Sequence, residues 1–118
     1  MKRPITATLV ALSALFAYAI PQAFATDASF GYISNLYAMN NGAILFYTSG
    51  TRTNPLPACS GPGLQQRYAL DASTTAGQAY ASVLLTAYTL HKQISVHGTG
   101  TCTIWSDTET VMFFNVAD

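Results

Sequence analysis

The feature that most constrains the fold is the start of the chain, because its first 25 residues have the pattern of an export signal. Lys2 and Arg3 precede an uncharged, largely apolar run at 5–20, and Ala23-Phe24-Ala25 follows. A positive start, an apolar stretch and an A-x-A ending are the three parts of a cleaved secretory signal peptide. A membrane anchor, the alternative, needs about 20 apolar residues, and this run is shorter. We expect an exported chain, periplasmic or secreted, with residues 26–118 as its single domain and without a membrane span after signal cleavage.

Without the leader, the charge balance of the chain is weakly negative. Three basic side chains remain against five acidic ones, which gives a net charge near −2. Charged residues make up 8% of the whole chain, compared with about 25% in an average globular domain. Nucleic acid binding needs a surplus of Lys and Arg to meet the phosphates, so we expect no nucleic acid partner.

The chain contains two cysteines, Cys59 and Cys102. In an oxidising compartment two cysteines are expected to form a disulfide, and only this pairing is possible. The bridge closes a loop of about 44 residues, which stabilises the domain by about 4 kcal/mol at most. Two free buried thiols are the alternative. A metal site is not expected, because the pair lacks the C-x-x-C spacing of zinc ligands.

Residue patterns predict five strands in the mature chain. The segments 30–39 and 43–48 are rich in aromatic and β-branched residues, and Asn40-Asn41-Gly42 between them is typical of a hairpin turn. The segment 49–63 contains three prolines and predicts a long loop. Three further strands are expected at 67–70, 93–97 and 110–116, with a short extension or strand at 102–105 and with Ile94 and Val96 facing inward.

One helix is expected between residues 76 and 91, after a run of capping side chains at 71–75. Its apolar residues recur at steps of three and four, which is the period of an amphipathic helix. We expect this face to pack on the core and, if the strands form a barrel, to plug one end of it. Its members are Ala76, Tyr80, Val83, Leu84, Ala87 and Leu90.

The resulting order is strand, strand, strand, helix, strand, strand. A mainly β chain with one helix in that place (α+β) matches an OB-fold-like five-stranded barrel. An α+β sandwich of a meander and one helix is the alternative.

The residues that could carry catalysis are few. His91 and His97 have a spacing that suits metal ligands neither on a helix nor on a strand. Asp107 and Glu109 would share a face if their segment were extended, but a solvated turn is the favoured interpretation. Neither a Gly-x-Ser-x-Gly elbow nor a phosphate-binding loop is present in the sequence. We therefore expect a protein that is not an enzyme, with no catalytic residue, cofactor or metal.

Binding is the better-supported class of function. In the first hairpin, Tyr32, Tyr37 and Tyr47 alternate with residues that look buried. A tyrosine ring can pack on a sugar while its hydroxyl and nearby Asn, Ser and Thr form directional hydrogen bonds. Such a surface suits a neutral or weakly acidic glycan, and it also suits a protein interface. Ordinary core tyrosines are the alternative.

Several segments resemble the B subunits of bacterial AB5 toxins, in particular the branch of the subtilase cytotoxin B subunit. These are Ile33-Ser34-Asn35-Leu36-Tyr37, the strand from Phe46 to Gly50, Ala58-Cys59-Ser60, and Tyr68 ahead of Ser73 and Thr74. Two others, Tyr68-Ala69-Leu70-Asp71 and Gly98-Thr99-Gly100-Thr101-Cys102, are also similar to a group of uncharacterised exported bacterial proteins.

The toxin resemblance implies a small exported OB-fold with a disulfide that assembles as a homo-pentamer and binds sialylated glycans. Ser29 falls within about a residue of a serine that contacts sialic acid in that family, so the resemblance assigns Ser29 to a glycan site. The competing expectation is a monomeric periplasmic or envelope structural protein without such a site.

Overall fold

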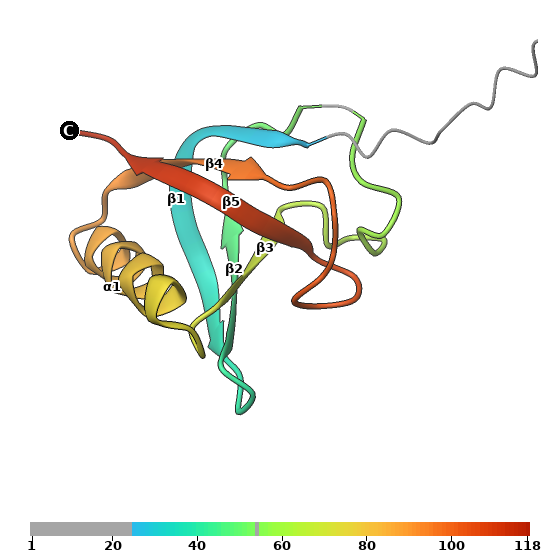
Figure 1. Ribbon diagram of the computed structural model, residues 1–118. Coiled ribbons are helices and arrows are strands. Elements are labelled where there is room, and N and C mark those ends of the chain that lie inside the picture. Colours follow the sequence, from blue (N-terminus) through green and yellow to red (C-terminus); the bar gives the residue numbers. More distant parts are fainter. Residues whose placement is uncertain (1–24, 54) are drawn as a thin grey trace, which may run out of the picture.

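The computed structural model describes residues 25–53 and 55–118. The predicted signal peptide lies outside these residues except for Ala25. The described part of the chain is mainly β with a single helix, and the predicted order of elements is confirmed (Figure 1). The elements are β1 (Asp27–Ala38), β2 (Ala43–Thr48), β3 (Arg67–Asp71), α1 (Thr75–Thr89), β4 (Gln93–Gly98) and β5 (Glu109–Val116). The expected short strand at 102–105 is reduced to one isolated bridge between Trp105 and Thr108.

The five strands close into a barrel in the order β1-β2-β3-β5-β4, and β4 pairs back onto β1. All neighbours are antiparallel except β3 and β5, which run parallel. The long β1 makes closure possible, because its first half pairs with β4 and its second half with β2. Figure 1 shows the bend of β1 between these two partners.

A close backbone crossing shapes the barrel where the chain leaves β2 and passes β1. A Cβ atom on Gly31 would lie 2.1 Å from the backbone nitrogen of Gly50, and one on Gly50 would lie 1.9 Å from the carbonyl oxygen of Ser29. Both positions therefore require glycine. Beyond the crossing, the chain continues alongside β1 and bridges Ala28 through Arg52.

The core lies inside the barrel, where the strands contribute alternate side chains. Ile94 and Val96 are fully buried, which confirms the inward face predicted for β4. The largest side chains of this core are Phe46, Tyr68, Leu70 and Leu84.

The helix packs on the barrel by a different face from the predicted one. Its buried residues are Gly77, Ala81, Leu84 and Ala87, so the prediction was correct for Leu84 and Ala87 alone. The predicted core residues Ala76, Tyr80, Val83 and Leu90 are exposed. Small side chains allow the helix to approach closely: a Cβ atom on Gly77 would lie 1.5 Å from the carbonyl oxygen of Asp71. The sequence pattern identifies a buried helix face by its most hydrophobic residues. Here the contact with the barrel favours small residues instead, so the pattern predicted the wrong face.

The disulfide is confirmed. Cys59 and Cys102 are bonded, with 6.1 Å between their Cα atoms. The bridge joins the loop after β2 to the loop before β5, and both loops lie at one end of the barrel (Figure 1).

The single helix of the described residues is not long and apolar enough to cross a membrane.

Candidate functional site

All four predicted glycan residues lie on the first hairpin, Ser29, Tyr32 and Tyr37 on β1 and Tyr47 on β2. The register shows how the tyrosines relate. Ser34 of β1 is opposite Tyr47 of β2, and Tyr37 is opposite Leu45. Three residues of β1 thus span two residues of β2, which is a β-bulge, and Asn35 takes a positive φ of 47° inside it. The extra residue keeps Ser34 and Tyr37 on the same outer side of the sheet. Without it, an odd separation would put them on opposite faces.

Tyr32 lies two residues before Ser34 and shares this outer side. Its backbone nitrogen donates to Ser49 Oγ over 2.9 Å, which places it beside the end of β2. Tyr32 is 40% exposed, and its ring stacks on His91, with 4.2 Å between ring centroids. We call Tyr32, Ser34, Tyr37 and Tyr47 the tyrosine face.

Ser29 lies apart from the tyrosine face, at the second bulge of β1 and at the crossing with Gly50. Its side chain is exposed, but Ser29 Oγ accepts a hydrogen bond from the backbone nitrogen of Thr51 over 2.9 Å. The hydroxyl therefore fastens the crossing strands and keeps only its own proton and one lone pair for a ligand.

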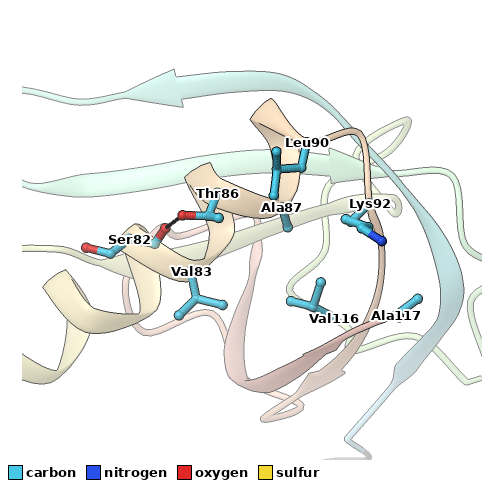
Figure 2. Close-up of a pocket in the computed structure, with 8 residues that line it drawn as sticks. All are labelled: Ser82, Val83, Thr86, Ala87, Leu90, Lys92, Val116 and Ala117. Carbon is cyan, nitrogen blue, oxygen red and sulfur yellow. Dashed lines mark hydrogen bonds between the residues drawn. The ribbon is translucent and has the colours of Figure 1, made fainter.

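A groove that the sequence did not predict lies between α1 and the end of β5 (Figure 2). It has a volume of about 390 Å³. Val83 of α1, Leu90 at the C-cap of the helix and Val116 of β5 line it, and Lys92 provides its one charged lining side chain. The signal was present in the sequence, because Val83 and Leu90 belong to the apolar stripe that was assigned to the core.

Apolar side chains continue beyond the groove over α1 and β5. The Tyr80 ring packs edge-on against Phe114, which joins the helix surface to β5. Exposed members of this α1–β5 surface are Tyr80, Val83, Leu90, Met112 and Val116. Contiguous exposed apolar surface is uncommon on a monomer and marks an interaction site.

A buried polar cluster closes the end of the barrel near residue 26. Glu109 is fully buried, so its expected place in a solvated turn is wrong. Its Oε2 pairs with the Arg52 guanidinium and accepts from the Thr26 hydroxyl. Its Oε1 accepts from the backbone nitrogens of Thr26 at 3.2 Å and Gly100 at 2.9 Å. Glu109 is the first residue of β5, and the barrel surrounds its side chain. The spacing of Asp107 and Glu109 in the sequence could not show this burial.

Tyr68 completes this cluster from β3. Its ring lies 4.2 Å from the Arg52 guanidinium carbon, and its hydroxyl donates to the carbonyl oxygen of Thr26 over 3.2 Å. Burial raises the pKa of Tyr68 well above its ordinary value, with Arg52 opposing and Glu109 adding to that shift. Both carboxylate oxygens of Glu109 already have hydrogen-bond partners inside the fold. The cluster is therefore suited to stabilising the barrel.

The remaining candidates for chemistry are separated in space. His91 follows α1, whereas His97 lies on β4, stacked on Phe113 with its Nδ1 3.0 Å from Asp27 Oδ1. Asp107 pairs with Arg67 at 2.7 Å. Within residues 25–53 and 55–118, no three His, Cys, Asp or Glu side chains come together as metal ligands would.

Comparisons of the chain with protein-family models, with curated proteins and with solved structures found no match.

Proposed function

We propose that this chain is an exported binding module and not an enzyme, and that its tyrosine face contacts a neutral or weakly acidic glycan. The observation that carries the proposal is the Tyr32 ring, which is exposed but held in one orientation by its stack on His91. A fixed aromatic ring loses little conformational entropy when a sugar packs against it. Export by the leader, an OB-like character of the barrel and kinship with toxin B subunits belong to the same proposal.

The surroundings of Tyr32 suit an uncharged ligand. The hydroxyls of Ser34, Tyr47 and Ser49 lie on or beside the tyrosine face. Arg67, which is opposite Tyr47 on β3, is already paired with Asp107. Hydroxyl groups give directional hydrogen bonds without the desolvation cost of a free charge.

Assembly into a ring, as a homo-pentamer, is the second part of the proposal. A single sugar site of this kind is weak, and several sites on one particle raise avidity without any new contact. The exposed α1–β5 surface, including the groove beside Leu90, supports association with other copies. The competing proposal is a monomeric periplasmic or envelope structural protein without a glycan site. It is favoured by Ser29, whose hydroxyl is already used inside the fold.

A glycan array probed with the protein, residues 26–118, tests the first part. We expect binding that Tyr32→Ala abolishes and that Tyr88→Ala, an exposed tyrosine on the helix, leaves unchanged. Ser29→Ala tests the glycan contact that the toxin resemblance assigns to Ser29. Unchanged binding by this variant would leave the tyrosine face as the glycan site without Ser29. No binding by folded protein at any glycan would leave the structural protein as the better proposal.

Native mass spectrometry of the same oxidised protein tests the second part. A fivefold assembly that Leu90→Ser dissociates supports the ring and its use of the α1–β5 surface. A monomer would remove the ring and its multivalent binding.

A further inference from the structure

Thr26 is the residue on which the buried polar cluster converges. It is 1% exposed, although it directly follows the exposed Ala25. Its nitrogen and its hydroxyl both bond to Glu109. Its carbonyl oxygen accepts from Gly98 N at 3.0 Å and from the Tyr68 hydroxyl. Every polar atom of this residue is therefore used by the barrel, which is unusual for a residue at the edge of a folded domain, where chain ends are poorly ordered.

We propose that the barrel contains a binding site for its own processed N-terminus, in which the α-ammonium group of Thr26 pairs with the Glu109 carboxylate. The inference rests on the proposed export, with cleavage after Ala25. Cleavage adds water across the Ala25–Thr26 peptide bond, leaving a carboxylate on Ala25 and an amine on Thr26 that takes up a proton near neutral pH. The nitrogen already lies 3.2 Å from Glu109 Oε1, so the new charge arises next to its partner.

The charges around this nitrogen suit a cation. Glu109 uses Oε2 for Arg52 and presents Oε1 to the nitrogen of Thr26. The Arg52 guanidinium packs over the Tyr68 ring, and its Nη1 donates to the carbonyl oxygen of Gln65. Its Nη2, which pairs with Oε2, also donates to the Thr26 hydroxyl over 2.5 Å, so the carboxylate lies between this cation and the nitrogen of Thr26. An ammonium strengthens the hydrogen bond to Oε1, because an ionised donor and acceptor attract more strongly than an amide and a carboxylate.

Amine labelling tests this inference directly. Residues 26–118 contain two primary amines, the α-amine of Thr26 and the ε-amine of the exposed Lys92. We compare reductive methylation of the native 26–118 chain with that of a 25–118 chain, whose first residue is the exposed Ala25. Lys92 serves as the internal standard in both. We expect the Thr26 amine to react at least about tenfold more slowly than the Ala25 amine, since it reacts only when the barrel end opens. Equal rates would overturn the inference.

Thermal unfolding of the same two chains separates ion pairing from simple burial. Both chains keep the titratable groups in and beside the cluster, Glu109, Arg52, Tyr68, Asp27 and His97. They differ in the added Ala25 and in whether the α-ammonium is on residue 26 or one residue earlier. We expect the 26–118 chain to melt about 5 °C higher at pH 6. The gap closes at pH 10, where the amine is neutral. No gap at pH 6, or a gap that persists at pH 10, would overturn the pairing.

A failure of the proposed export can be told apart from a failure of the ammonium site. The mass of the protein recovered from the periplasm or medium of exporting cells shows its first residue. A start other than Thr26, or no export, contradicts the processing on which the site depends in the cell. The labelling and melting of the purified 26–118 chain still decide whether the site binds an ammonium group.

Discussion

The ring of Tyr32 lies flat on the imidazole of His91, with 8° between the two planes. His91 has a φ of 53° and directly follows the helix. Its nitrogen donates to the carbonyl oxygen of Tyr88, and the next nitrogen, of Lys92, donates to that of Ala87. This is the Schellman pattern, in which glycine usually occupies the left-handed position. An aromatic pair therefore holds the helix end to β1 at a position where a side chain costs free energy.

Replacing His91 tests the balance between this contact and the backbone cost. His91→Ala should lower the free energy of unfolding by about 1 kcal/mol, since the stack is lost and the left-handed backbone remains. His91→Gly loses the same stack but relieves the backbone, so it should stay within about 0.5 kcal/mol of the wild type. Urea denaturation measures both. An equal loss in the two variants would show that the backbone of residue 91 is not under strain.

The two arginine ion pairs should differ strongly in their effect on stability. Arg52→Met leaves the carboxylate of Glu109 buried without its partner and should cost about 3–5 kcal/mol. Arg67→Met breaks the pair with Asp107, whose side chain is 46% exposed, and should cost about 1 kcal/mol or less. Thermal melts of the two variants provide the comparison. Similar losses would mean that water reaches the Glu109 carboxylate in the folded protein.

Gly77→Ala should destabilise the protein although alanine is the better helix former by about 1 kcal/mol. The added Cβ would meet the backbone carbonyl oxygen of Asp71 at 1.5 Å, and backbone cannot yield as a flexible side chain can. We expect a loss of about 2 kcal/mol or more, in the range of an overpacked core. Gln78→Ala, at the next and exposed position of α1, is the control. A stabilised Gly77→Ala variant would contradict the close helix contact.

Removing the disulfide by Cys59→Ser together with Cys102→Ser should lower the free energy of unfolding by up to about 4 kcal/mol. The measurement is urea denaturation of the variant beside wild type with and without a reductant. Reduced wild type should match the double variant. A reductant that leaves the midpoint unchanged would show that the bridge does not constrain the unfolded chain.

Asp71 gives a prediction for acid. The backbone nitrogen and hydroxyl of Ser73 both donate to its carboxylate, which lowers the pKa of Asp71 below its ordinary value. A lowered pKa adds stability at pH above the unfolded value, about 3.9, and the gain is lost as the pH falls through the folded value. Wild type should therefore melt above Asp71→Asn at pH 6 and match it at pH 2. A difference that is the same at both pH values would contradict the charged hydrogen bond.

Local pattern determined much of the architecture. The hairpin with Asn40-Asn41-Gly42 and the order of strands and helix followed from the sequence, because turn residues and apolar period act over a few neighbours. The pairing of Cys59 with Cys102 followed as well, since two cysteines allow a single bridge. The sequence identified the tyrosines of the tyrosine face as candidate binding residues but did not show how they lie relative to one another. The geometry of this face depends on the bulge at Asn35, which exists only relative to the paired strand.

Tertiary structure decided the rest. The buried face of α1 is set by how close the helix can come to Asp71, so Gly77 and Ala81 are inside while Val83 and Leu90 face the groove. Glu109 looks like a surface residue in sequence because its compensating charge, Arg52, is 57 positions away. Burial of a charge becomes acceptable only when distant partners arrive together, and closure of the barrel brings them there.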